Sequence, residues 1–268
     1  MRAHRFANKV VLITGAGRGM GRAEAIAFAK EGANLILNDI CHDDKAVMYK
    51  LSTEDDLNYT LKLVKEEGAS AIKVIADVSD SSAVRDMVAE AIKRFGKIDI
   101  LINNAGIVAG WHPVSQLEEW IWDRTIAVNL SSQFYVIKNV LPYMIKQNWG
   151  RIINISSTGG LIGFEGSAHY VASKHGILGL TKSLALEVAK YNITVNAVCP
   201  GRTNTTMTVE MMKMSSDFDR SGDSMNIFPN RGLIEPDDVA KLVLFLASED
   251  AKEITGACIP IDRGYTSR

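Results

Sequence analysis

The chain has 268 residues, of which 47% are hydrophobic and 23% charged, as is typical of a single globular α/β domain. A formal net charge of −1 excludes a strongly basic protein that binds nucleic acid or an acidic membrane surface. The sequence has no bilayer-length apolar run, no secretory signal pattern and only three widely spaced cysteines, so we expect a cytoplasmic protein with reduced thiols.

Short β-branched runs alternate with longer helical patterns along the chain. The short runs are apolar throughout, as in strands buried on both faces of a parallel sheet. Strands are predicted at 9–14, 34–39, 71–77, 97–103, 150–156, 192–198 and 256–262, with helices at 21–32, 82–96, 115–148 and 167–191. These repeated units predict one α/β domain over residues 1–268, a doubly wound parallel sheet (Rossmann fold) with helices on both faces.

A glycine-rich run, TGAGRGMG, follows the first predicted strand and begins the first helix. Gly15, Gly19 and Gly21 let the backbone turn tightly and approach a pyrophosphate, whose charge a helix N-terminus stabilises. The spacing is Gly-x-x-x-Gly-x-Gly rather than the more common Gly-x-Gly-x-x-Gly. We predict a dinucleotide site here, and the alternative is a purely structural turn.

Asp39 ends the second predicted strand. A carboxylate at this place can accept hydrogen bonds from the adenosine ribose, and it repels a 2′-phosphate. A strand-end aspartate without a ligand is the alternative. Arg18, in the glycine-rich run, has the opposite implication, because an arginine there can contact a 2′-phosphate. The sequence favours NAD over NADP.

Tyr170 and Lys174 lie four residues apart on a predicted helix and share a face, and Ser157 lies thirteen residues before Tyr170. A free tyrosine has a pKa of about 10, too high for a base near neutral pH, and a neighbouring ammonium favours the phenolate. Taken singly, these residues suit a hydrogen-bonded core. Together with a dinucleotide site, they indicate hydride transfer between a nicotinamide cofactor and an alcohol or ketone.

In this order, the motifs resemble the classical short-chain dehydrogenase/reductase family over nearly the whole chain. Asn103-Asn104-Ala105-Gly106, Asn129 in IAVNL and Pro200-Gly201 match further motifs of the family. An insert at about 41–67 and the run SSTGGLIGFEGSAHYVASKHG resemble the carveol-dehydrogenase-like branch, which is often linked to the redox carrier mycofactocin. The segment after Pro200 departs from that branch.

The resemblance implies four catalytic residues. Tyr170 is the acid–base group, Ser157 holds the substrate oxygen, Lys174 supports the phenolate and contacts the nicotinamide ribose, and Asn129 keeps a water in a proton relay. We assign cofactor contacts to Gly15, Arg18, Gly19, Met20, Gly21, Asp39, Ile40, Asp77, Val78, Asn104, Ala105, Gly106, Tyr170, Lys174, Pro200, Gly201, Thr203 and Thr205. The five histidines have no metal-ligand spacing, so we expect no metal.

The segment 203–233 is rich in methionine and is predicted to be an apolar substrate lid, with simple core packing as the alternative. Met207, Met211, Trp111 and Phe164 are the expected substrate contacts, beside Ser157 and Tyr170. They favour a hydrophobic cyclic secondary alcohol or ketone, such as a terpenoid alcohol or a hydroxysteroid. The alternatives are a 3-oxoacyl-type or other small-carbonyl reductase, an epimerase or dehalogenase of the same fold, and a non-catalytic nucleotide-binding sensor.

Two segments bear on partners. The 41–67 insert carries both charge signs and is predicted to be an exposed loop and helix; it could instead cover the adenine or contact a neighbouring subunit. The helix at 167–191 is apolar around much of its circumference, which predicts burial against another subunit, and the alternative is burial within one subunit against the 115–148 stretch. With the family resemblance, this predicts a homotetramer. An external redox carrier is a further candidate partner.

Overall fold

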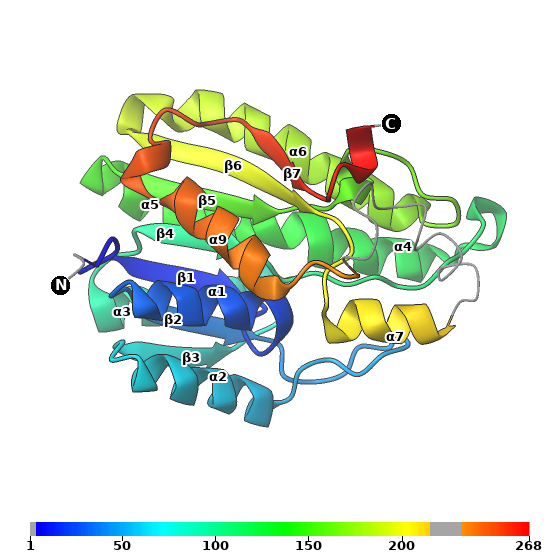
Figure 1. The fold of residues 1–268 in the computed structure, drawn as a ribbon, viewed down its shortest axis with the longest axis horizontal. Helices are drawn as coiled ribbons and strands as arrows, with labels where there is room; N and C mark the ends of the chain where they lie inside the picture. The colour runs from blue at the N-terminus through cyan, green and yellow to red at the C-terminus, as the bar shows by residue number, and fades with distance from the viewer. Residues whose placement is uncertain (1–3, 215–231, 268) are drawn as a thin grey trace.

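The computed structural model describes residues 4–214 and 232–267, which form one parallel sheet between two layers of helices (Figure 1). The strands lie in the order β3-β2-β1-β4-β5-β6-β7, and every neighbouring pair is parallel. Their bounds are β1 Val10–Thr14, β2 Asn34–Asp39, β3 Ala71–Ile75, β4 Ile100–Asn103, β5 Gly150–Ile155, β6 Ile193–Pro200 and β7 Cys258–Ile261. The predicted doubly wound fold is confirmed.

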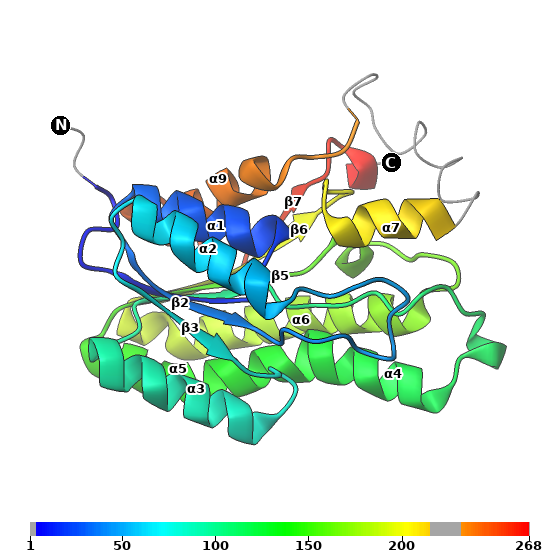
Figure 2. The same ribbon diagram turned by 90° about the horizontal axis from the view of Figure 1, so that it is seen from below.

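The helices cover both faces of the sheet (Figure 2). One layer holds α1 (Gly19–Lys30), α2 (Glu54–Glu66) and α9 (Pro236–Ala247). The other holds α3 (Ser81–Phe95), α4 (Glu119–Ile126), α5 (Ser132–Gln147) and α6 (Ala168–Val188). None of the helices in the described part of the chain is long and apolar enough to cross a bilayer.

Alternate residues of each central strand face opposite layers, which explains why the strands are apolar throughout. In β1, Val11 and Ile13 belong to the core beneath α1 and α9, whereas Val10 and Leu12 belong to the core beneath α3, α5 and α6. Glu24 of α1 is the exception in its layer, because this carboxylate is fully buried and has no hydrogen-bond partner among the described residues.

The helical stretch predicted around 115–148 is divided in the structure. A π-helical turn, Ala127–Ser131, joins α4 to α5. A π-turn widens the helix and shifts its backbone hydrogen bonds, a local change that apolar spacing does not reveal. Asn129 lies in the middle of this turn and is fully buried.

The predicted lid is described only at its two ends. Thr203 pairs with Ile234 in an isolated parallel bridge, and α7 (Thr206–Met214) follows (Figure 1). The rest of the predicted lid, residues 215–231, lies outside the described residues.

Candidate active site

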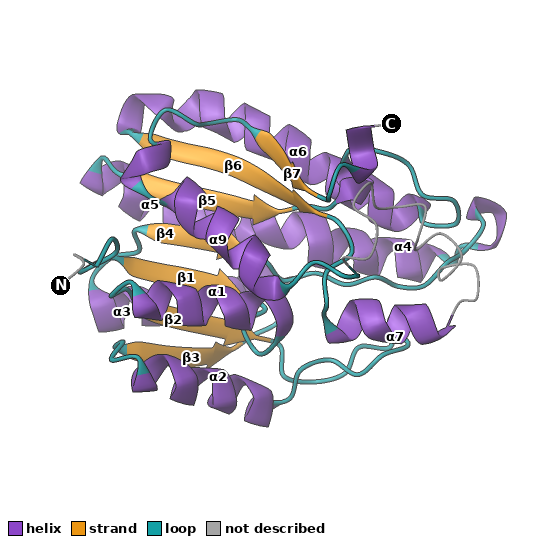
Figure 3. Cartoon of the chain, in the orientation of Figure 1, coloured by secondary structure: helices purple, strands orange, loops and turns teal. Residues whose placement is uncertain are grey.

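The loops that follow the strands gather at one edge of the sheet (Figure 3). Side chains of these loops line a cleft. The cleft lies at the carboxyl ends of β1 to β4, around the point where the strand order reverses, which is where doubly wound sheets bind ligands. Most of the predicted cofactor contacts line it: Gly15, Arg18, Gly19, Met20, Asp39, Ile40, Asp77, Val78, Asn104, Ala105, Gly106 and Thr205.

The glycine loop brings backbone close to this cleft. Gly15 and Gly19 have positive φ angles of 68° and 56°, which residues with a Cβ rarely adopt. α1 begins at Gly19, and no described side chain caps its N-terminus. A Cβ on Gly21 would lie only 2.2 Å from the carbonyl oxygen of Gly15, so this glycine permits the loop to pack on the helix. The uncapped N–H groups suit a pyrophosphate.

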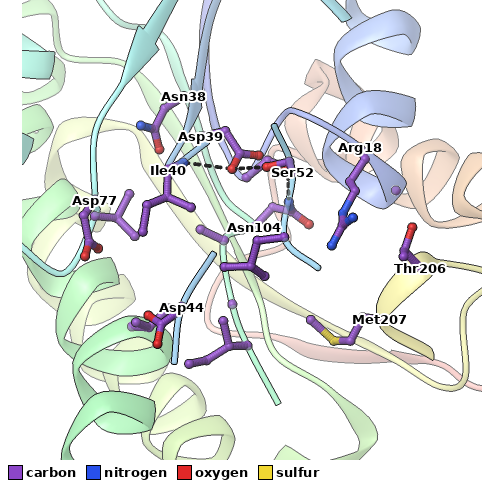
Figure 4. Close-up of a pocket in the computed structure, with 18 of the residues that line it drawn as sticks. Arg18, Asn38, Asp39, Ile40, Asp44, Ser52, Asp77, Asn104, Thr206 and Met207 are labelled. Atoms are coloured by element: carbon purple, nitrogen blue, oxygen red, sulfur yellow. Dashed lines mark hydrogen bonds between the residues drawn. The ribbon is translucent and has the colours of Figure 1, made fainter. Parts of the chain in front are cut away.

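Asp39 is held at the end of β2 by three donors. Its Oδ2 accepts a hydrogen bond from the Gly17 backbone N–H at 2.8 Å, and its Oδ1 accepts one from the Ile40 N–H at 2.8 Å. The Ser52 hydroxyl also donates to Oδ1 (Figure 4). The carboxylate is buried yet lines the cleft, so a ribose hydroxyl could donate to its remaining lone pairs.

The adenine end of the predicted site contains an ion-pair network that no motif in the sequence predicts. Arg124 of α4 donates to Asp77 Oδ2 at 2.9 Å and to Asp44 Oδ2 at 2.6 Å, and it also donates to the Ser79 hydroxyl at 2.5 Å. Burial raises the pKa of Asp77, but hydrogen bonds from Ser79 and Arg124 outweigh it and the net pKa is lowered. Asp77 therefore stays ionised and fixed beside the cleft.

Residues 41–52, which we call the cover loop, differ from the expected exposed loop. Ala46, Tyr49 and Ser52 are buried, although His42 and Asp43 are exposed as expected. The Tyr49 hydroxyl accepts a hydrogen bond from the Val108 N–H at 3.1 Å. This bond holds the cover loop against the opposite side of the cleft. The loop is buried because its side chains contact residues that are distant in the sequence. The second half of the insert forms α2.

The loop after β4 connects the cleft to the predicted catalytic residues. Asn104 Nδ2 donates to the carbonyl oxygens of Thr14 and Gly15, at 2.9 and 3.1 Å. Its buried Oδ1 has no hydrogen-bond partner within the described chain, which leaves an acceptor beside the cleft. A Cβ on Gly106 would lie 3.4 Å from Lys174 Nζ and 3.3 Å from Asn129 Oδ1, so this loop packs against both residues.

Tyr170 and Lys174 project from α6 on the same face, as predicted. Lys174 is buried, donates to the Ile155 carbonyl at 3.0 Å, and has its pKa lowered to about 8 by burial, against a smaller opposing effect of Cys199. Burial raises the pKa of Tyr170, whereas a hydrogen bond with Ser157 lowers it. Ser157 itself accepts a hydrogen bond from the Gly159 N–H at 3.1 Å. These contacts place a hydroxyl, a phenol and an ammonium together.

Asn129 is fixed by hydrogen bonds rather than pointing at open space. Its Oδ1 accepts from the Ile107 N–H at 2.8 Å, and its Nδ2 donates to the Ile107 carbonyl at 2.9 Å and to the Ser173 hydroxyl at 3.1 Å. The side chain therefore clamps the β4 loop onto the π-turn.

Four substrate contacts are predicted besides Ser157 and Tyr170. Two of them, Phe164 and Trp111, lie near Tyr170 or the loop before it. A Cβ on Gly159 would lie 2.9 Å from the Phe164 ring and 3.2 Å from the Tyr170 ring. Trp111 packs beside Gly166, since a Cβ there would lie 3.5 Å from Trp111 Cβ. Met207 lines the cofactor cleft, whereas the side chain of Met211 is buried in α7 and is not among the described lining residues. This burial of Met211 matches the core-packing alternative.

Other predicted contacts lie around the cleft without lining its described surface. Gly21 packs behind the glycine loop, and Pro200, Gly201 and Thr203 continue from the end of β6. The lining also includes residues that the motifs do not predict: Asn38, Asp44, Tyr49, Leu51, Ser52, Ala76, Ile107, Arg124, Val128 and Thr206. Within the described ranges, no group of three His, Cys, Asp or Glu residues could hold a metal ion.

Comparison with protein families gives one model that spans most of the chain. Residues 15–266 match the family described as enoyl-(acyl carrier protein) reductase. Among curated relatives, the (−)-trans-carveol dehydrogenase of Rhodococcus erythropolis is 37% identical, covering 98% of this chain and 99% of the relative. The 3-oxoacyl-[acyl-carrier-protein] reductase of Thermotoga maritima is 38% identical, covering 97% of this chain and 98% of the relative.

A solved structure is similar over almost every residue. The crystal structure of carveol dehydrogenase from Mycobacterium avium in complex with NAD aligns with a TM-score of 0.94 and 31% sequence identity. The alignment covers 99% of this chain and all of that one. The similarity therefore includes both the sheet and the loops around the cleft.

Proposed function

The chain belongs to the short-chain dehydrogenase/reductase family, and from this premise we propose that it is an NAD-dependent oxidoreductase acting on a hydrophobic cyclic secondary alcohol or its ketone. The observation that carries the proposal is the arrangement of Tyr170, Lys174 and Ser157 beside a cleft with an uncapped helix N-terminus and a strand-end carboxylate. Tyr170, Lys174 and Ser157 suit proton transfer, whereas the helix N-terminus and the carboxylate suit a dinucleotide.

The residues of the cleft fit NAD in three places. The N-terminus of α1 would hold the pyrophosphate, Asp39 would accept from the ribose hydroxyls, and the loop at Asn104 would lie near the nicotinamide half. When bound, NAD supplies a hydride acceptor or, in its reduced form, a hydride donor. Support for NAD comes from the carboxylate of Asp39 and from the NAD complex of the similar M. avium protein.

In our proposal, Ser157 donates a hydrogen bond to the substrate oxygen and holds it against Tyr170. Tyr170 takes the hydroxyl proton during oxidation and returns it during reduction. The Lys174 ammonium supports the phenolate by its charge. Asn129 positions the neighbouring loop through Ile107, so that Gly106 and Lys174 keep their places.

The substrate class is inferred from the apolar groups around Tyr170. The Phe164 ring lies beside the Tyr170 ring, and Trp111 packs on the adjoining turn at Gly166. Two aromatic groups beside one polar centre suit a compact ring with a single hydroxyl or carbonyl. The similarity to a carveol dehydrogenase supports a terpenoid alcohol. The similarity to a 3-oxoacyl-carrier-protein reductase supports the second candidate, a smaller carbonyl substrate.

A two-part experiment tests the proposal. Direct titration calorimetry with NAD⁺ and NADP⁺ tests cofactor binding without any substrate. A panel of cyclic secondary alcohols, hydroxysteroids and 3-hydroxyacyl thioesters is then assayed with NAD⁺ and with an artificial electron acceptor. Turnover of cyclic alcohols in preference to hydroxyacyl thioesters is expected. The opposite preference would favour the second candidate, and binding of NAD⁺ without turnover of any class would favour a sensor.

We also propose a cytoplasmic homotetramer. Several large apolar side chains are exposed on the single chain, including Trp120, Trp122 and Phe134 around α4 and α5, Leu186 of α6 and Phe245 of α9. Leu186 is 85% exposed, which is unusual for a leucine on a helix that is otherwise largely packed. Burial between subunits would remove these surfaces from water. An external redox carrier is proposed as a partner for reoxidation of the cofactor, and the artificial acceptor in the assay tests it.

A further inference from the structure

We propose that Ser52 of the cover loop is a positioning residue for cofactor selection, which locks Asp39 in the orientation that accepts a ribose and excludes a 2′-phosphate. This inference rests on the proposed use of NAD and deepens it. The sequence predicts that Asp39 favours NAD, but a carboxylate at the end of a strand can rotate away from its ligand. The structure assigns the control of that rotation to a residue thirteen positions later in the chain.

The two carboxylate oxygens of Asp39 accept hydrogen bonds from different segments of the chain. Gly17 of the glycine loop holds Oδ2, while Ile40 and Ser52 hold Oδ1. Both backbone donors belong to segments that any strand–turn–helix unit of this kind would have. The Ser52 hydroxyl is the only one of these three donors that comes from the insert. Because its acceptor is a charged oxygen, this bond is stronger than a bond between neutral groups.

Packing makes the arrangement rigid. Ser52 and Asp39 are 5% and 7% exposed, so little of either side chain is in contact with water. A Cβ on Gly17 would lie 2.8 Å from both Asp39 Oδ2 and Ser52 Cβ. The three residues therefore form one close-packed unit at the wall of the cleft. The Ser52 hydroxyl fills the space beside Oδ1.

The cover loop also binds Arg18, the cation that could favour NADP. Arg18 lines the cleft and donates a hydrogen bond to the backbone carbonyl of Lys50, two residues before Ser52. This bond ties the Arg18 guanidinium to the cover loop and engages one of its N–H donors. Two features of one loop thus act in the same direction. Ser52 holds the repelling carboxylate of Asp39 (Figure 4), and the Lys50 carbonyl binds the attracting arginine.

The arrangement gives a specific expectation for binding. Without the Ser52 hydroxyl, Asp39 loses a donor to its charged form and gains freedom to turn. We expect Ser52→Ala to weaken NAD⁺ binding about tenfold, the effect of one hydrogen bond to a charged group. NADP⁺ affinity is expected to stay the same or to increase. The dissociation constant for NADP⁺ divided by that for NAD⁺ therefore falls toward one.

Titration calorimetry of the purified protein with NAD⁺ and with NADP⁺ measures both constants, and a double-mutant cycle identifies the route of the effect. If Ser52 acts through Asp39, Ser52→Ala has no further effect on NAD⁺ affinity in an Asp39→Ala background. Ser52→Gly removes the same hydroxyl and serves if the alanine variant does not fold. An equal loss of NAD⁺ affinity in both backgrounds would overturn the proposal.

Thr53→Ala is the matched control. Thr53 is the N-cap of α2 and accepts a hydrogen bond from the Asp56 N–H at 3.2 Å, so its loss disturbs the same turn without touching Asp39. It is expected to lower the melting temperature and to leave the ratio of dissociation constants unchanged. A fall in this ratio equal to that of Ser52→Ala would mean that the loop acts only through its stability, and would overturn the proposal.

Arg18→Met completes the test. Loss of affinity for NAD⁺ and NADP⁺ by the same factor is expected, because Arg18 holds the cover loop for both. A selective loss of NADP⁺ affinity would show that Arg18 binds the 2′-phosphate. It would overturn the proposed role of Arg18 as an anchor of the cover loop. If the unaltered protein binds neither cofactor, the proposed function fails. If it prefers NAD⁺ and Ser52→Ala keeps that preference, only the present inference fails.

Discussion

The ammonium of Lys174 lies 5.7 Å from the centre of the Tyr170 ring, one turn along the same face of α6. The distance is short enough for its charge to stabilise a phenolate, and both groups have lost much of their contact with water. In the protein without cofactor, the two burial effects oppose ionisation of both groups. A small electrostatic change can therefore decide whether Tyr170 and Lys174 are neutral or ionised.

Tyr170→Phe is expected to lower turnover by about 10²–10⁴-fold, the usual contribution of a general acid–base group. The phenyl ring keeps the packing against Gly159 and Phe164, so NAD⁺ affinity and melting temperature should change little. Steady-state kinetics with the best alcohol of the panel, beside calorimetric NAD⁺ binding, measures this. Retention of most activity in a folded variant would remove the proposed mechanism.

Arg124→Met is expected to destabilise the protein by about 2 kcal/mol, because it removes charged hydrogen bonds from Asp44 and Asp77. The cover loop should also be cut more quickly by trypsin, which cleaves after Lys45 and Lys50. Urea unfolding and timed proteolysis measure the two effects. Arg85→Met is the control, since Arg85 and its partner Asp86 are both highly exposed and their pair should contribute little.

The Glu24 carboxylate makes stability depend on pH. Burial raises its pKa from 4.5 to about 8 in the folded protein. A pKa raised by folding gives stability that is fully present below the unfolded pKa and is lost as pH rises through the folded value. Between pH 5 and pH 9 the protein should therefore lose stability on the order of 4 kcal/mol through this group.

Glu24→Gln should remove this dependence. Denaturant unfolding at pH 5 and pH 9 is expected to give nearly equal stabilities for variant and parent at the acidic pH and a more stable variant at the alkaline pH. Glu90→Gln, on the exposed surface of α3, is the matched control and should leave the pH dependence unchanged. A parallel decline of the parent and Glu24→Gln curves would contradict the assignment.

The proposed tetramer has a simple readout. Light scattering at micromolar concentration should give a mass near four times the 29.3 kDa of one chain. Leu186→Lys places a charge on a highly exposed apolar position of α6 and should shift the mass downward if this face is an interface. A mass near that of a single chain for the unaltered protein would reject the tetramer.

The sequence was sufficient to predict the sheet because its signal is local. Apolar runs such as Val10–Thr14 and Ile193–Pro200 are buried on both faces, and the pattern needs no knowledge of distant residues. The glycine loop, Asp39 and the Tyr170–Lys174 spacing were recognisable for the same reason. Each is a short motif whose chemistry depends on neighbours in the sequence.

What the sequence did not reveal depends on contacts between distant segments. Charge mixture in the insert predicts exposure, but Asp44 is covered because it meets Arg124, eighty residues later. Ser52 has no motif of its own and becomes significant only through Asp39. The π-turn at Asn129 keeps helical spacing on both sides, so periodicity could not place it.

The bonds between Asn104 and Thr14 join positions ninety residues apart and have a consequence for folding kinetics. β1 and β4 are neighbours in the sheet, yet two strands and three helices are made between them. Pairing of such high contact order is slow, because loop-closure entropy is lost before native contacts repay it. A refolding chain should regain helix before it regains nucleotide affinity. NAD⁺ binding after dilution from denaturant would then report the last step of assembly, and a fragment ending before β4 should not bind it.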